Sequence, residues 1–164
     1  MKVPHNRGMA MDAVDRQILE ILQEDGRITN AELANRVGLT PGPVLARVNK
    51  LEETGYITGY RGLVDPEKVG LSFSAFVAVI LRSHGEKECQ SFIDAMKLVP
   101  EVQEVHHIAG DEDYLLKVVA TSARDYERLL LDHITGHEHV RRVKTILVLS
   151  TQKFTTTAPI KKDL

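Results

Sequence analysis

Residues 40–50, TPGPVLARVNK, place two basic side chains, Arg47 and Lys50, behind a front of small residues. Guanidinium and ammonium groups on an exposed helix can bind DNA phosphates and the acceptor atoms of base edges. Small residues at the front of such a helix let its backbone approach the major groove. The residues predicted to contact DNA are therefore Thr40, Pro41, Gly42, Pro43, Ala46, Arg47, Asn49 and Lys50.

A second stretch whose residue types could bind a ligand is AGDEDY, residues 109–114. Gly110 permits a tight turn between strands, and Asp111, Glu112 and Asp113 concentrate negative charge at its tip. A turn alone needs no such charge, so the stretch is a candidate ligand site. The alternative is a solvated acidic turn without a ligand, because β-turns select Asp and Gly for conformational reasons.

The elements that position residues 40–50 are three predicted helices. Asp12 can cap the first, and Thr29-Asn30-Ala31-Glu32 is a capping box for the second, which Gly38 can end in the left-handed conformation. Leu39 can turn inward and pack at the turn between the second and third helices. The apolar positions of the first helix fall on one face and are Val14, Ile18, Leu19, Ile21 and Leu22.

The third helix explains the two prolines at its front. Thr40 is a suitable N-cap, and Pro41 and Pro43 occupy the first turn, whose amides have no partner within the helix. The buried stripe is predicted to be Val44, Val48 and Leu51, with Leu45 beside them. A short helix, a glycine turn and a second helix form a helix-turn-helix. The alternative is an ordinary three-helix bundle with a solvated basic face.

From residue 72 the pattern changes to alternating strands and helices. Strands are predicted at 73–81, 102–108, 114–120 and 143–149, and helices at 87–99 and from the Ser122 cap to Ile134. The order βαββαβ predicts a ferredoxin-like sandwich and an α+β chain overall. The expected domains are 1–61, a linker at 62–71, a second domain at 72–155 and a tail at 156–164.

Composition excludes several classes of protein. The 164 residues are 43% hydrophobic with a net charge of −2, so a nucleic-acid surface must be local. Residues 36–61 carry four basic and two acidic side chains. One cysteine, Cys89, rules out an internal disulfide framework and fits a reducing cytosol. No apolar run of 18 residues or apolar signal core occurs, which predicts a cytoplasmic protein without membrane insertion.

The histidines do not form a convincing metal site. His133 and His137 have helical spacing, but Gly136 lies between them, and His106 and His107 point to opposite faces of a strand. The sequence also shows no recognisable catalytic nucleophile or phosphate-binding loop. The sequence therefore predicts a protein that is not an enzyme and holds no metal or other cofactor.

Two long stretches resemble a known family. They are DRQILEILQEDGRITNAELANRVGLTPGPVLARVNKLEETGYITGYRGLVDPEKVGL and IAGDEDYLLKV, and the resemblance to the Lrp/AsnC (leucine-responsive, feast/famine) transcriptional regulators covers nearly the whole chain. The resemblance implies a winged-helix-like DNA-binding domain followed by an effector-binding domain. One departure concerns Gly42, where the family usually carries a Ser or Thr available to DNA.

The resemblance also implies partners and a location. The second domain would form a homodimer by sheet-to-sheet contact, assemble further to an octamer, and place the protein on the nucleoid. The turn at Gly110 would bind the amino and carboxylate groups of a free amino acid, with Asp113 holding the ammonium and Asp111 able to share that charge. Aliphatic walls favour a nonpolar amino acid, and the candidates are Ile108, Ala109, Ile146 and Val148.

Two alternative functions remain open at this point. A branch related to this family removes carboxyl groups from tetrapyrroles, and the histidines with Arg141 and Arg142 could be imagined binding an acidic ring. The other alternative is a DNA-organising protein that responds to no effector. The intact helix-turn-helix pattern and the glycine-aspartate turn together favour the regulator.

Overall fold

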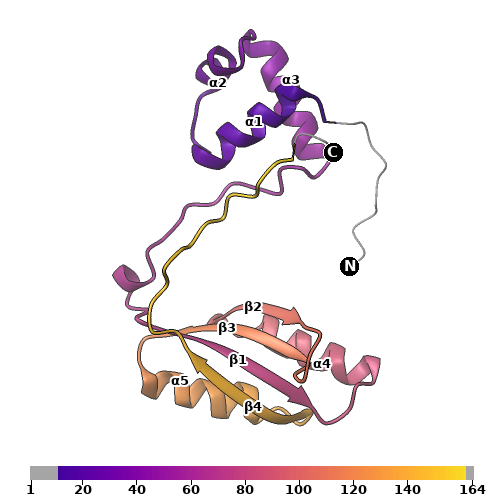
Figure 1. Ribbon diagram of the computed structural model, residues 1–164, viewed down its shortest axis with the longest axis vertical. Coiled ribbons are helices and arrows are strands. Elements are labelled where there is room, and N and C mark those ends of the chain that lie inside the picture. Colours follow the sequence, from indigo (N-terminus) through magenta and orange to yellow (C-terminus); the bar gives the residue numbers. More distant parts are fainter. Residues whose placement is uncertain (1–10, 162–164) are drawn as a thin grey trace. The chain divides into compact units, whose positions relative to one another are not determined.

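The computed structural model describes residues 11–161, so residues 1–10 of the expected first domain and 162–164 of the expected tail lie outside the described residues. The described chain divides into two compact units (Figure 1), one comprising residues 11–63 and 153–161 and the other residues 64–152. Most of the expected linker thus groups with the second unit, where Glu67–Val69 forms a short 3-10 helix, η1. The linker at 62–71 stays a prediction.

The first unit contains the three predicted helices, α1 (Ala13–Glu24), α2 (Asn30–Val37) and α3 (Pro41–Glu53). The Thr29 hydroxyl accepts the Glu32 amide at 3.2 Å, as expected, but the reciprocal capping box forms at α1 instead, between Asp12 and Asp15. Gly38 ends α2 in the left-handed conformation with φ 70°. The left-handed Gly38 allows the tight turn between α2 and α3, while the two caps fix where α1 and α2 begin.

Two details at α3 differ from expectation. Thr40 is the N-cap, but its hydroxyl makes no capping hydrogen bond. Pro41 and Pro43 remove two of the amides in the first turn, and an N-cap side chain most often bonds the amide at the place of Pro43. Leu45 was expected beside the buried stripe, yet it is 45% exposed because the core-facing side of α3 is occupied by Val44, Val48 and Leu51.

The second unit has the predicted βαββαβ order. Its elements are β1 (Phe73–Leu81), α4 (Glu86–Lys97), β2 (Val102–His107), β3 (Tyr114–Ala120), α5 (Ala123–Leu129), the π-helical turn η2 (Leu130–Thr135) and β4 (Val140–Leu147). The strands form one antiparallel sheet in the order β2-β3-β1-β4. β4 begins three residues before the predicted position because Val140, which is buried, pairs with Leu81 across a bulge.

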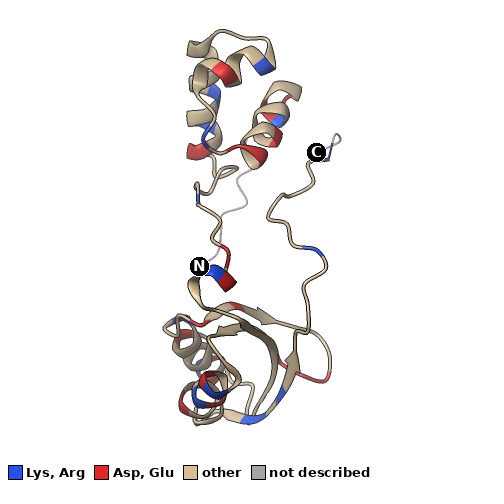
Figure 2. Ribbon diagram, turned by 90° about the vertical axis from the view of Figure 1, so that its left-hand side faces the viewer, with Lys and Arg blue, Asp and Glu red and all other residues tan. Residues whose placement is uncertain are grey.

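The core of the second unit lies on the helix-covered face of the sheet (Figure 2). Alternate residues of β1, including Val77 and Val79, pack with Phe92 and Met96 of α4 and with side chains of α5. Because side chains alternate along a strand, the intervening residues point to the opposite face. These include Phe76 on β1, Leu115 on β3 and Ile146 on β4, the last 44% exposed.

The segment after β4 returns to the first unit and contacts α1. The Gln23 side-chain amide pairs with the backbone of Ala158, accepting its N–H at 2.6 Å and donating to its carbonyl at 3.1 Å. The expected second domain ended at residue 155 and the expected tail began at 156, whereas the observed first unit includes residues from 153 onward. The two hydrogen bonds of Gln23 join Ala158 to α1 within this unit.

The packing makes a stability prediction for the second unit. Leu116 is fully buried in the sheet core, whereas Leu98 is 84% exposed at the end of α4. Leu116→Ala is expected to lower the free energy of unfolding by about 2–5 kcal/mol, because it leaves a cavity among β1, α4 and α5. Leu98→Ala, the same chemical change at the surface, is expected to stay within about 0.5 kcal/mol. Denaturant unfolding of both variants is the measurement, and equal losses would contradict this core.

Candidate DNA-binding helix and effector-binding turn

The outward face of α3 is defined by residues opposite its buried stripe. Gly42, Ala46 and Asn49 are exposed and lie in line, because residues four and seven apart share a helix face. Pro43 is also exposed, and Lys50 is half-buried on the same flank. Thr40 and Pro41 are exposed at the start of the helix. The fold thus presents seven of the eight predicted DNA contacts on or beside one surface.

Arg47 is the exception. Its Nη1 atom lies 2.7 Å from Asp12 Oδ2 and 2.6 Å from Asp15 Oδ1, so the guanidinium is bound to the N-terminus of α1. The Arg47 side chain is 33% exposed, while the Asp15 side chain is only 10% exposed. The sequence predicted an outward-facing side chain, whereas the structure binds the guanidinium to two carboxylates at the start of α1. A contact of Arg47 with DNA stays a prediction.

The electrostatics of this cluster make Arg47 a structural group. Among the described residues, Asp15 is the one buried polar or charged side chain. Hydrogen bonds to Asp15 and Asp12 raise the pKa of Arg47. The pKa of Asp12 is lowered, chiefly by the hydrogen bond from the Asp15 amide and further by Arg47. A buried carboxylate without a partner is costly, so Arg47 compensates a charge that the helix cap requires.

Sequence reasoning recognised Asp12 as a cap but did not connect it with Arg47. The two residues are far apart in the chain, and only the packing of α1 on α3 brings them together. A signal was nevertheless present, because Asp15 sits among the apolar positions of a helix and needs a cationic partner. Both signs of charge occur on the helices of each unit (Figure 2).

The predicted effector turn is a six-residue connection, 108–113, between β2 and β3. The Ile108 amide donates to the Asp113 carbonyl at 3.0 Å, and the Asp113 amide donates to the Val79 carbonyl at 2.9 Å. Gly110 has a φ of 156°, a value that other residues rarely adopt. Ile108 is half-buried, while Ala109, Gly110 and Asp111 are exposed. The connection is therefore anchored at its base and open at its tip.

Asp113 was expected to hold the ammonium group of a ligand, and the structure gives it other partners. Its Oδ2 atom accepts the Leu81 amide at 2.8 Å, and its Oδ1 atom lies 2.9 Å from His84 Nε2. On the preceding residue, Glu112 Oε1 lies 3.4 Å from Lys144 Nζ. The carboxylate that projects into solvent at the tip is therefore that of Asp111.

Ile146 and Val148, the other predicted walls, do not meet this turn within one chain. The turn is bonded to β1 at Val79, whose carbonyl accepts the Asp113 amide. Further along β1, Ile146 pairs with Phe76, and the Val148 amide donates to the Ser74 carbonyl. Val79 and Ser74 are roughly 17 Å apart along β1. In addition, β2 and β4 are the two opposite edges of the sheet. Aliphatic character alone did not reveal which end of the sheet each residue occupies.

Several histidines have packing roles near the turn. The His107 ring stacks on Tyr114 with centroids 5.1 Å apart, and the His137 ring meets Phe92 edge-on at 5.5 Å. Burial lowers the pKa of His137, whose ring is half-buried. Burial and a hydrogen bond with Cys89 raise the pKa of Tyr114 to about 12. Within residues 11–161, no group of three or more potential metal ligands is assembled.

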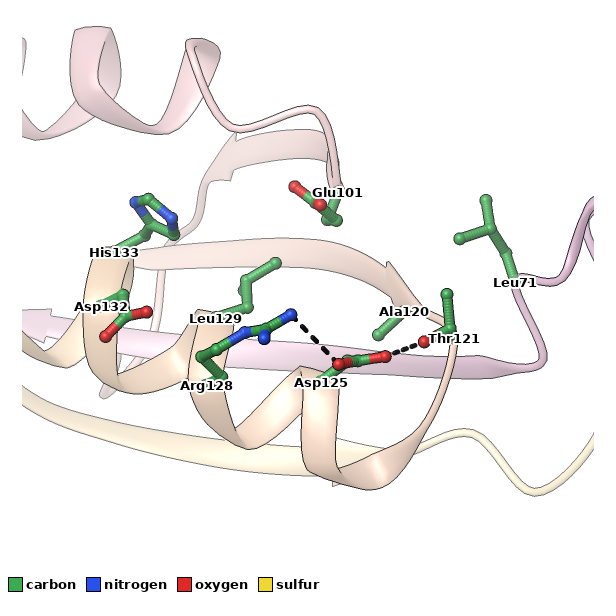
Figure 3. Close-up of a pocket in the computed structure, with 9 residues that line it drawn as sticks. All are labelled: Leu71, Glu101, Ala120, Thr121, Asp125, Arg128, Leu129, Asp132 and His133. Atoms are coloured by element: carbon green, nitrogen blue, oxygen red, sulfur yellow. Dashed lines mark hydrogen bonds and ion pairs between the residues drawn. The ribbon is translucent and has the colours of Figure 1, made fainter.

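A separate pocket of about 230 Å³ lies at the other end of β3 (Figure 3). Asp125 bonds both the Thr121 hydroxyl and Arg128 there. Because β3 runs from the turn at Tyr114 to the pocket at Ala120, the pocket is distinct from the predicted effector turn. Sequence reasoning did not predict this pocket, whose lining residues are Leu71, Glu101, Ala120, Thr121, Asp125, Arg128, Leu129, Asp132 and His133.

The two units correspond to two recognised types of domain. Residues 11–58 match the model of a winged helix-turn-helix DNA-binding domain, and residues 74–158 match the model of the Lrp/AsnC ligand binding domain. A DNA-binding unit joined to a ligand-binding unit defines a ligand-responsive transcription factor as the class. No helix within the described range is long and apolar enough to span a bilayer.

Relatives resemble the chain over most of its length. It is 39% identical to the leucine-responsive regulatory protein of Rhizobium meliloti (strain 1021) over 85% of this chain and 89% of that protein. It is 34% identical to the transcriptional regulator AzlB of Bacillus subtilis (strain 168), over 93% and 98% respectively. The protein belongs to the Lrp/AsnC family of transcriptional regulators.

Solved structures agree with this assignment. A transcriptional regulator from Neisseria meningitidis, solved with L-Met, aligns with a TM-score of 0.88 and 35% identity, covering 92% of this chain and 97% of that chain. The AsnC protein of E. coli aligns with a TM-score of 0.85 and 30% identity, covering 92% and 100% respectively.

The Arg47 cluster makes a prediction that differs from that for an ordinary surface cation. Arg47→Ala is expected to destabilise the helix-turn-helix by about 1–3 kcal/mol, because Asp15 keeps a buried charge without its partner. Hydrogen exchange of the α1 and α3 amides is the measurement, since it reports opening of this unit alone.

Arg36→Ala is the matched control. Arg36 pairs with Glu24 at 3.8 Å and both side chains are exposed, so its loss is expected to cost no more than about 1 kcal/mol. Adding Asp15→Asn to Arg47→Ala should recover part of the loss, because the uncompensated charge is then removed. A loss in Arg47→Ala no larger than in Arg36→Ala would rule out the structural role.

Proposed function

We propose that this protein is a sequence-specific DNA-binding regulator whose DNA affinity or assembly state responds to a small amino acid. The observation that carries the proposal is the helix-turn-helix itself, in which α3 presents Gly42, Ala46 and Asn49 on an exposed face. The family assignment supports it, because the matched domains are a DNA-binding and a ligand-binding domain. The tetrapyrrole decarboxylase alternative gains no support from the relatives, which are named as regulators.

We propose that the acting form is a homodimer that assembles further, up to an octamer. The sheet face opposite the helices supports this, because it presents Phe76, Leu115 and Ile146. Apolar side chains on a sheet face gain stability when a second sheet covers them. A homodimer supplies two copies of α3, so weak local contacts with DNA add through multivalency. Such a protein acts in the cytoplasm, on the nucleoid.

We propose that the effector binds at the 108–113 turn, with Asp111 as the free carboxylate and Asp113 as the group that holds the turn in shape. The backbone bonds that close the base of the turn give it a fixed form, which favours binding with little loss of entropy. Ile108 and Ala109 supply aliphatic contacts, while Ile146 and Val148 of the same chain are too far away. The L-Met complex of the Neisseria regulator supports a nonpolar effector.

The DNA-binding proposal predicts a footprint with two-fold symmetry. Two copies of α3 in a dimer should protect a nearly palindromic site whose half-sites lie about one helical turn of DNA, or a multiple of it, apart. Lys50→Ala should weaken binding similarly on all sequences and reduce the dependence on salt, because an ammonium group on the flank of α3 meets phosphate. Footprinting and salt titrations of wild type and Lys50→Ala check this, and protection without helical periodicity would contradict it.

The effector proposal predicts a residue-specific loss of affinity. A thermal-shift screen of the twenty amino acids identifies the ligand, and calorimetric titration of Asp111→Asn should then show about three- to tenfold weaker binding, because the charge of the ammonium contact is lost. Asp132→Asn is the matched control, since Asp132 lines the separate pocket beside η2.

The variants separate the possible locations of the ligand. Loss of binding in Asp132→Asn with normal binding in Asp111→Asn would move the effector to the pocket. If none of the twenty amino acids shifts the melting temperature, the effector-independent DNA organiser is the better description.

A further inference from the structure

The exposed surface of α3 is poor in groups that hydrogen-bond. Every residue of this helix is described, and its outward line consists of Gly42, Ala46 and the amide of Asn49. Pro43 and Leu45, both exposed, extend the apolar surface on either flank. A helix that recognises base edges chiefly by hydrogen bonds would present several donors and acceptors here. The apolar content therefore needs another explanation.

Arg47 cannot supply the missing hydrogen bonds without a cost to the fold. Arginine is the usual partner of guanine, which it binds through two acceptors in the major groove. Here the guanidinium is bound to Asp12 and Asp15, and Asp15 is buried. Moving Arg47 to a base would leave that carboxylate uncompensated, so guanine recognition by Arg47 is disfavoured.

The glycine at the front of α3 is not required by the protein's own packing. A Cβ atom at Gly42 would meet no atom within 4 Å, and Gly42 does not have a positive φ. The fold would therefore accept a side chain at this position. The glycine leaves an open surface one helical turn before Ala46, and an apolar group of a partner can lie against it.

We propose that α3 recognises the 5-methyl groups of thymine in the major groove, with Ala46 as the main contact and the Pro43 ring beside it. Thymine is the one base that presents a methyl group there, and alanine side chains are suited to contact it. Asn49, one turn further along, has the amide geometry that pairs with N6 and N7 of adenine. The inference rests on the proposed DNA-binding function and names what that surface recognises.

The test exchanges thymine for deoxyuridine, which removes the methyl group and keeps every hydrogen-bonding atom. A binding site is first selected from random duplexes by the full-length protein. Duplexes are then made with deoxyuridine at single thymine positions, and affinity is measured at fixed salt. Each contacted methyl should contribute about a fourfold change in the dissociation constant, from the burial of one apolar carbon.

Two variants assign the effect to a residue. Ala46→Ser replaces the apolar surface with a solvated hydroxyl and should abolish the preference for thymine over deoxyuridine at one position of each half-site. Ala13→Ser makes the same change at the exposed first turn of α1 and should retain the preference. Both side chains are exposed, and circular dichroism melting confirms that both variants fold.

The outcomes distinguish this inference from the function on which it rests. Equal affinity for thymine and deoxyuridine duplexes at all positions would overturn methyl recognition while leaving DNA binding intact. An unchanged preference in Ala46→Ser would overturn the assignment to α3. Failure to select any sequence from the random duplexes would overturn both the inference and the proposed sequence-specific function.

Discussion

The contact of Arg47 with Asp12 and Asp15 joins α3 to α1 at the one buried charged side chain among the described residues. Asp15 is buried at the start of α1, where its side chain also caps the helix, and a buried carboxylate requires a cation. Arg47 meets that need from α3, which fixes the rotation of α3 against α1. The side of α3 that remains for DNA is decided by this rotation.

Much of the fold could be predicted from local pattern. The bounds of β1 and β3 follow from apolar runs, and the turn before α3 follows from Gly38 and Pro41, since each expresses a backbone preference of a few neighbouring residues. The start of β4 was predicted three residues too late, because it depends on Val140 pairing with Leu81 across a bulge. The partners of Arg47 could not be predicted, because they arise from packing between helices.

The predicted effector turn can be compared with the helix-turn-helix in the same way. Residue types correctly marked 108–113 as a charged turn, but they did not show that Asp113 already binds the Leu81 amide and His84. The expected walls Ile146 and Val148 lie away from the turn of the same chain for a different reason. Strand order places β4 at the edge opposite β2, and order depends on the crossover connections of the whole domain rather than on any local pattern.

Both units therefore divide charged neighbours between internal and external roles. Arg47 and Asp113 are held by hydrogen bonds within the protein, whereas Asp111 is exposed and Lys50 is half-buried on the outward flank of α3. A paired charge holds its site in a fixed conformation. Breaking the pair would leave a charged group without a partner, which costs free energy. The neighbour with the unsatisfied charge is the one that can gain by binding a partner. The residues proposed to bind DNA and effector are accordingly displaced by a few positions from those that a sequence motif marks most strongly.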